Sequence, residues 1–177
     1  MKYSDFPYKR IDFNQFKENV VKMIKKFELS ESADDQIIII EEYQNIQKET
    51  QTYGSIAHLN FARNTKETKA VEENKFYDGI GPEIAAIDNQ FTKAINASKF
   101  KKELLDKFGK HFFDLIDMEL KSFDPKLVVL MKEENELSNE YRSLLAGAEM
   151  DYKGKILNLA GLSPYMQDTN RETRKEA

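Results

Sequence analysis

Apolar residues recur at three- and four-residue steps along most of the chain, which places them on one face of an α-helix. A first stripe, over residues 12–28, follows Asp12, a residue type that caps helix N-termini. Similar stripes predict a second helix over about 34–63 and a third over about 67–97. The apolar members of the first stripe are Phe13, Phe16, Val20, Ile24 and Phe27.

Two positions in these helices need a separate interpretation. The run Ile37–Ile40 also suits a buried strand, but the pattern continues in phase through Tyr43, so we expect a helix whose isoleucines face a bundle on every side. Pro82 lies inside the third helix, beside Gly79 and Gly81. Because proline removes a backbone hydrogen bond and clashes with the preceding turn, we expect a kink near Pro82.

The last third of the chain changes its period. After short helices over about 98–107 and 110–123, Asp124-Pro125 is expected to start a long helix that ends near Ala148. Alternating polar and apolar residues then predict a β-hairpin near 149–159, turning at Lys153-Gly154. The fold class is therefore mainly α: a bundle of about six helices, one kinked near Pro82, with one β-hairpin near 149–159.

A short helical turn and the start of a final helix follow the hairpin. Asp168 or Thr169 is expected to cap that helix, with Glu172 completing a capping box. No glycine, proline or polar break terminates the helix before the sequence stops, so we expect the 177 residues to be the front part of a larger protein. The expected division is an N-terminal helical lobe over 1–123 and a second region over 124–177.

Composition and charge exclude several classes of function. With 40% hydrophobic and 33% charged residues and a net charge of -4, the chain is globular, and its charges do not form a basic face for nucleic acid. The absence of cysteine excludes disulfides and thiolate metal sites and suits a reducing compartment. No signal peptide is recognisable, and the longest aliphatic run, Ile37–Ile40, cannot span a bilayer, so we expect a cytoplasmic protein without membrane contact.

The usual signatures of catalysis are missing. His58 and His111 have no ligand-like spacing, and we interpret both as structural or surface histidines, which leaves no cofactor site in this chain. Tyr141, Tyr152 and Tyr165 are the candidate substrate-channel residues, since their hydroxyls could line a groove. The alternative is that they bridge core and solvent, as tyrosines commonly do. We therefore predict no catalytic residue and no metal ligand in this chain.

Five segments, in order along the chain, carry a resemblance to a known family. They are FPYKR, FYDGIGPEI, LLDKFGKHFF, EENELSNEY and LSPYMQDTNRETRKEA. Together they resemble the N-terminal portion of the oligoendopeptidase F family, zinc metallopeptidases related to the thimet oligopeptidases. The resemblance implies a largely helical protein with a deep channel between two lobes, a hydrolase that cuts short peptides. In that family an H-E-x-x-H motif and a further glutamate hold the zinc.

The departure from the family is the absence of H-E-x-x-H. The resemblance therefore implies a non-catalytic N-terminal lobe that forms one wall of the channel, with 124–177 leading into a missing catalytic domain. Zinc is implied for the parent metalloendopeptidase, and this chain alone is expected to be inactive. The implied partners are short peptides and the catalytic domain, and the exposed docking surface is expected to allow self-association. The alternative is a stand-alone helical peptide- or protein-binding module without catalysis.

Overall fold

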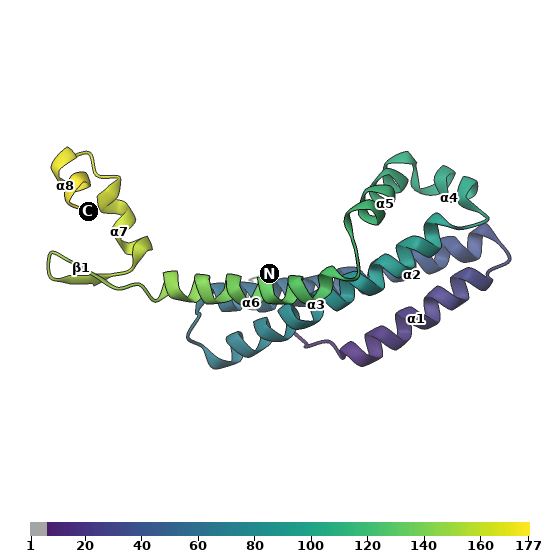
Figure 1. Cartoon of the computed structure of the whole chain (residues 1–177), viewed down its shortest axis with the longest axis horizontal. Helices are drawn as coiled ribbons and strands as arrows, with labels where there is room; N and C mark the ends of the chain where they lie inside the picture. Colours follow the sequence, from purple (N-terminus) through teal and green to yellow (C-terminus); the bar gives the residue numbers. More distant parts are fainter. Residues whose placement is uncertain (1–6) are drawn as a thin grey trace. The chain divides into compact units, whose positions relative to one another are not determined.

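The computed structural model describes residues 7–177, most of which are helical (Figure 1). Eight α-helices and one two-stranded antiparallel hairpin lie within these residues, which confirms the predicted mainly α fold. The chain divides into two compact units, unit 1 (Met1–Lys132) and unit 2 (Glu133–Ala177). The elements are α1 (Phe13–Leu29), α2 (Ala33–Arg63), α3 (Thr68–Asn96), α4 (Lys101–Phe108), α5 (Lys110–Ser122), α6 (Leu127–Ala146), β1 (Met150–Tyr152), β2 (Lys155–Leu157), α7 (Leu159–Met166) and α8 (Arg171–Glu176).

The core of unit 1 is formed where the predicted helix stripes meet. α1, α2 and α3 pack on one another, α5 packs on α3, and α4 packs on α5 and α2. Phe91 of α3 is 1% exposed, and its ring meets Phe27 edge-on at 5.4 Å and Tyr43 at 4.5 Å between centroids. The aromatic contacts therefore join all three long helices at one point.

Asp12 and Gln36 form hydrogen bonds that help to define the helices of unit 1. Asp12 caps α1 as predicted, because its Oδ1 accepts a hydrogen bond from the Gln15 amide at 3.0 Å. Gln36, only 2% exposed, donates from Nε2 to the Phe27 carbonyl at 3.0 Å and accepts from Ser98 Oγ at 2.5 Å. One buried amide thus links the end of α1, the start of α2 and the segment after α3.

The segment before α1 is held against α3 by one carboxylate. Arg10 donates from Nε and Nη2 to the two Glu73 oxygens at 2.9 and 2.8 Å, a bidentate pair. The Tyr8 hydroxyl donates to the same carboxylate, and its ring meets Tyr53 edge-on. Arg10 lowers the pKa of Glu73, while burial raises the pKa of Tyr8.

Three expectations for the long helices meet different outcomes. α3 continues without interruption through Pro82, so the kink stays a prediction. The isoleucine run is helical, but Ile38 is 51% exposed while Ile39 and Ile40 are 1% exposed, so the expectation that the run is covered on every side was wrong. α6 begins at Leu127 rather than at the proline, because Asp124 Oδ1 accepts from the Lys126 amide at 2.9 Å and closes a turn first.

In unit 2 the hairpin forms around the predicted turn. Lys153 and Gly154 have φ values of 58° and 76°, the left-handed pair that a tight two-residue hairpin turn requires. Met150 pairs with Leu157, and Tyr152 with Lys155. Asn170, not Asp168 or Thr169, caps α8, because its Oδ1 accepts from the Glu172 amide at 2.9 Å. No helix among the described residues is long and apolar enough to cross a membrane.

Candidate functional site

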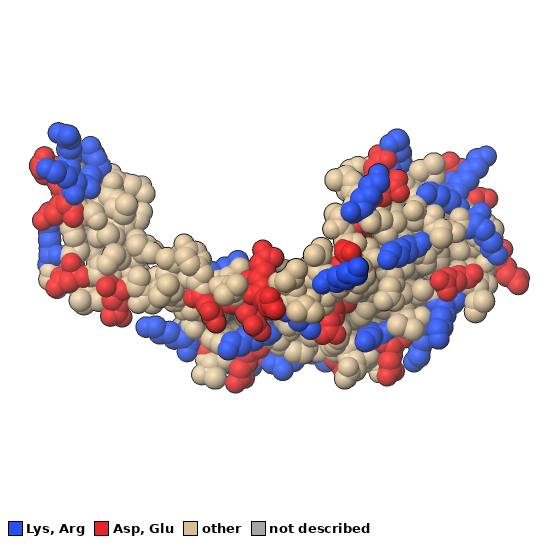
Figure 2. Space-filling model, in the orientation of Figure 1, with Lys and Arg blue, Asp and Glu red and all other residues tan. Residues whose placement is uncertain are grey.

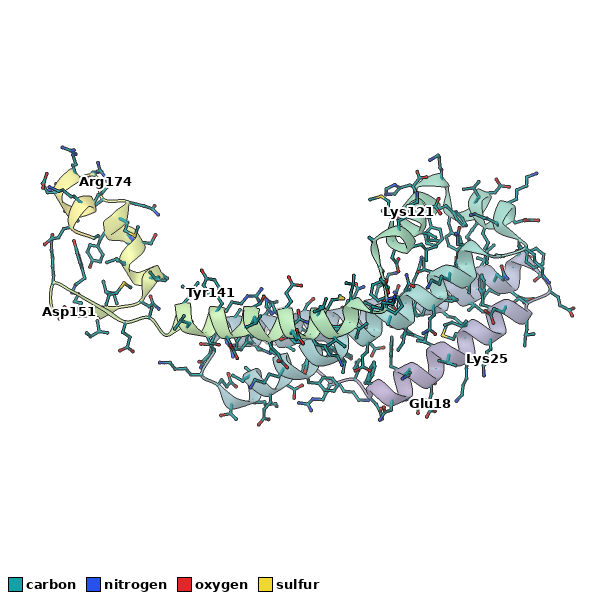
Figure 3. All side chains as sticks on the ribbon, viewed as in Figure 1. Glu18, Lys25, Lys121, Tyr141, Asp151 and Arg174 are labelled. Carbon is teal, nitrogen blue, oxygen red and sulfur yellow. The ribbon has the colours of Figure 1, made fainter. Side chains whose placement is uncertain are left out.

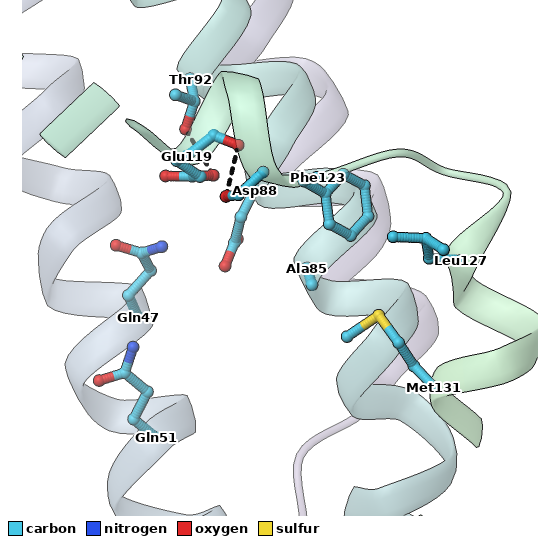
Figure 4. Close-up of a pocket in the computed structure, with 10 residues that line it drawn as sticks. Gln47, Gln51, Ala85, Asp88, Thr92, Glu119, Phe123, Leu127 and Met131 are labelled. Carbon is cyan, nitrogen blue, oxygen red and sulfur yellow. Dashed lines mark hydrogen bonds between the residues drawn. The ribbon is translucent and has the colours of Figure 1, made fainter. Parts of the chain in front are cut away.

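A cavity of about 580 Å³ opens on unit 1, where α2, α3, α5 and the start of α6 meet (Figure 4). The side chains that α2, α3 and α5 contribute are polar or short, whereas Phe123 and the start of α6 contribute large apolar side chains. α2 contributes residues one turn apart, and α3 contributes residues spaced three and four apart on one face. Its lining consists of Gln47, Gln51, Ala85, Asp88, Thr92, Glu119, Ser122, Phe123, Leu127 and Met131.

One side of the cavity is acidic and hydrogen-bonded. Asp88 accepts a hydrogen bond from the Tyr43 hydroxyl, and burial, together with the nearby Glu119 charge, raises the pKa of Asp88. Burial likewise raises the pKa of Tyr43. Thr92 Oγ1 donates to Glu119 Oε1 at 3.2 Å, and the Ser122 hydroxyl donates to the Glu119 carbonyl, as the dashed lines in Figure 4 show.

The other side is apolar, formed by Ala85, Phe123, Leu127 and Met131 (Figure 4). Among the described residues that line the cavity, none is basic, so its two carboxylates have no cationic partner there. Such a surface can accept amide N–H groups or a cationic side chain on one side and an aliphatic side chain on the other. The cavity is thus suited to binding a peptide segment, and it presents no nucleophile with an adjacent base.

The structure brings two of the three predicted tyrosines together. Tyr152 of β1 is 8% exposed, and its ring lies 4.7 Å from that of Tyr165 of α7, centroid to centroid. Tyr141 is 61% exposed on the C-terminal part of α6 (Figure 3). Within residues 7–177 no ring contact joins Tyr141 to the other two. The channel role of the three tyrosines stays a prediction.

The histidines do not form a metal centre. His58 Nδ1 lies 3.2 Å from Asn74 Oδ1, and His111 is exposed on α5. In the part of the chain that the structure describes, no group of three or more His, Cys, Asp or Glu residues could hold a metal ion. A zinc ion does not fit the donor sets present here, because it needs three or four converging ligands.

Comparison with known proteins identifies the family. The sequence pattern of the peptidase M3 N-terminal domain matches residues 3–123. The chain belongs to this family. This match covers most of unit 1. Together with the solved structures described next, it confirms the resemblance to the N-terminal portion of the oligoendopeptidase F family.

Solved structures extend the similarity to the whole chain. A protein assigned as an oligoendopeptidase F from Bacillus anthracis str. Ames is 29% identical, with a TM-score of 0.93, and covers 99% of this chain and 32% of its own. PZ peptidase A with an inhibitor is 28% identical at the same TM-score, covering 98% and 31%. A further protein assigned as oligoendopeptidase F is 27% identical, covering 99% and 31%. The chain therefore spans about a third of the length of the solved structures it matches. No curated protein sequence matches it.

None of the cavity residues was predicted as a site residue from the sequence. They come from four helices and from positions between 47 and 131, and no spacing in the sequence brings such positions together. The available signal was weak: Gln47 and Gln51 are polar residues one turn apart in α2, beside the apolar stripe that contains Tyr43. A solvated helix face produces the same pattern.

Proposed function

We propose that this chain is the non-catalytic N-terminal lobe of a zinc metallo-oligopeptidase that hydrolyses short peptides, and that it forms one wall of the substrate channel. The observation that carries the proposal is the match of residues 3–123 to the peptidase M3 N-terminal domain. It is supported by solved relatives that contain the whole arrangement within chains about three times as long.

In this role the chain would bind peptide, and another part of the enzyme would carry out the hydrolysis. Zinc in such an enzyme polarises the peptide carbonyl and activates water, and its ligands must come from outside this chain because residues 7–177 offer no group that could hold it. This chain would contribute two binding surfaces. One is the cavity with Asp88 and Glu119, and the other is the aromatic pair Tyr152 and Tyr165. We propose that both surfaces contact peptide, and the channel role of Tyr141 stays a prediction.

The proposed partners follow from the same division. They are short peptides and a catalytic domain of the M3 type, and the cysteine-free composition supports the cytoplasm as the compartment. Exposed apolar side chains should also let the isolated chain self-associate at high concentration. Sedimentation velocity over a wide concentration range measures this, and a monomer throughout would contradict it.

A chimera tests the proposal. This chain would replace the matching third of the Bacillus anthracis relative, and hydrolysis of fluorogenic short peptides would be measured with zinc present. We expect the chimera to cleave and the isolated 177-residue chain not to cleave. A folded, zinc-loaded chimera without activity would contradict the role as a channel lobe.

The alternative function is a stand-alone helical module that binds peptides without catalysis. The observation that favours it is the cavity, which lies wholly within unit 1 and offers acidic and apolar sides to a peptide. Titration of the isolated chain with short Lys- or Arg-containing peptides separates the two. Tight binding that Asp88→Asn and Glu119→Gln abolish, together with an inactive chimera, would favour the module.

A further inference from the structure

The C-terminal part of α6, from Glu133 onward, is a helix that the other elements of unit 2 leave uncovered. None of the twenty described residues of α6 is buried. The other elements of unit 2 pack on one another instead: β1 on β2, β2 on α7, and α7 on α8. Because helices in proteins owe most of their stability to packing of an apolar face, a helix of this kind needs a partner.

Its apolar residues form a defined stripe. Leu137, Tyr141 and Leu144 follow one another at steps of four and three residues, so they share one face of α6. Their side chains are 66%, 61% and 72% exposed. We call these three residues the α6 stripe. Three large apolar side chains in line, all exposed, are the pattern by which one helix docks on another.

The charges beside the α6 stripe indicate what kind of partner fits it. Glu133, Glu134, Glu136 and Glu140 are all exposed, whereas Arg142 is the one cation between Glu133 and Leu144. Acidic side chains gather over the middle of α6 in Figure 2. An anionic membrane surface would be repelled, and a second copy in parallel register would place like charges together. A partner helix with lysine or arginine beside its apolar face would be attracted.

We propose that the α6 stripe docks on the catalytic portion of an M3 peptidase, against a helix whose apolar face is flanked by basic residues. This inference rests on the proposed function and names the surface through which the two parts join. The solved relatives carry about two thirds of their length outside the match, and that part would supply such a helix. The proposal places Tyr141 on the docking surface, which is an alternative to its predicted role in the substrate channel.

Co-expression tests the proposal without assuming that either part folds alone. This chain, carrying an affinity tag, would be produced together with the two thirds of the Bacillus anthracis relative that lie outside the match. We expect the two polypeptides to purify together. Leu137→Asp and Leu144→Asp should each weaken the complex at least about tenfold, because a charge would enter an apolar contact.

The matched control is Leu29→Asp, at a leucine that is 79% exposed in unit 1 and outside the α6 stripe. It should leave the complex unchanged. The double variant Glu136→Lys and Glu140→Lys should weaken binding and reverse its salt dependence, since the partner's basic residues would then be repelled. Circular dichroism of each variant verifies that the chain remains helical.

The outcomes separate this inference from the proposed function. A complex that hydrolyses peptides but is indifferent to both aspartate variants would overturn the docking surface and leave the proposed function standing. No complex with the unaltered chain would overturn both. A dimer of this chain that depends on the α6 stripe and persists beside the catalytic portion would identify a second copy as the occupant and overturn the inference.

Discussion

Units 1 and 2 are both helical, but they are stabilised in different ways. Unit 1 buries a continuous set of aromatic and aliphatic side chains centred on Phe91. In unit 2 the buried side chains among the described residues are Tyr152 and Leu162 alone. Unit 1 therefore has the core of an independently folding domain, whereas unit 2 is too small and too open to gain much from burial.

Local chemistry takes the place of a core in unit 2. Asp151 Oδ1 accepts from the Gly154 amide at 2.9 Å and closes the hairpin turn, and Asn158 caps α7 by accepting from the Gly161 amide at 2.8 Å. Lys153 Nζ lies 2.7 Å from a Glu176 oxygen and connects hairpin and α8. Such contacts define local shape but contribute little free energy each, so unit 2 should depend on a partner.

The largest effect on stability is expected from Phe91→Ala, which tests whether unit 1 has its own core. Loss of a ring that is 1% exposed should lower the free energy of unfolding of unit 1 by about 3–5 kcal/mol. Urea unfolding followed by far-UV circular dichroism measures this, with Leu29→Ala, at a 79% exposed position, as the control. A cost below about 1 kcal/mol would show that the aromatic cluster is not the core of unit 1.

In unit 2 the matching change is Leu162→Ala. The side chain is 7% exposed, and its loss should destabilise unit 2 by about 2 kcal/mol. Because unit 1 has its own core, its urea midpoint should stay the same. Hydrogen exchange read peptide by peptide should show faster exchange over residues 150–176 only. Faster exchange throughout α1–α3 would mean that the two units unfold as one.

Glu73→Gln probes the charged contact at the edge of unit 1. Loss of the Arg10 pair should cost about 1 kcal/mol at pH 7. The folded state lowers the pKa of Glu73, so its contribution is present above the ordinary carboxyl pKa and is lost as the pH falls through the folded value. The difference between the two proteins in urea unfolding should therefore disappear in acid. A difference that persists at pH values well below the folded-state pKa of Glu73 would exclude the charged contact as its cause.

Asp88→Asn should change the free energy of unfolding in the opposite direction from Glu73→Gln, and by a smaller amount. Burial raises the pKa of Asp88, so its contribution to stability is complete below the ordinary pKa and is lost as the pH rises. Removing the charge should stabilise unit 1 by about 0.5 kcal/mol at pH 7, with the gain vanishing in acid. Thermal unfolding at several pH values measures it. Destabilisation at pH 7 would mean that the hydrogen bond from the Tyr43 hydroxyl to the charged carboxylate outweighs the cost of burying the charge.

The smallest effect is expected at the α6 stripe. Leu144→Ser alters a side chain that is 72% exposed, so the stability of the isolated chain should change by less than about 0.5 kcal/mol. Thermal unfolding and hydrogen exchange of α6 check this. A clear loss of stability would show that the chain covers Leu144 itself and needs no partner there.

The sequence pattern was sufficient to predict those elements that depend only on a few neighbouring residues. The apolar stripe of α1 and its Asp12 cap, and the left-handed pair Lys153-Gly154, are encoded within a few neighbouring residues. The family resemblance added the lobe's identity, because ordered segments across the chain carry more information than any single motif.

Features that depend on competition or assembly could not be predicted. Asp168, Thr169 and Asn170 all have capping side chains, and Asp168 instead accepts from the Asn170 amide at 2.7 Å, which leaves Asn170 to cap α8. Ile38 belongs to an apolar run, yet the packing of α1 and α3 on α2 decides which of its residues are covered. The cavity around Asp88 exists only once four helices have come together.

The central claim, that this chain supports peptide hydrolysis without performing it, is tested most directly by the purified chain itself. The 177-residue protein would be incubated with zinc and a mixture of short peptides, and the products would be analysed by mass spectrometry. The account predicts intact peptides with zinc and with a chelator alike. Zinc-dependent cleavage that co-elutes with the pure chain and stops on chelation would contradict it.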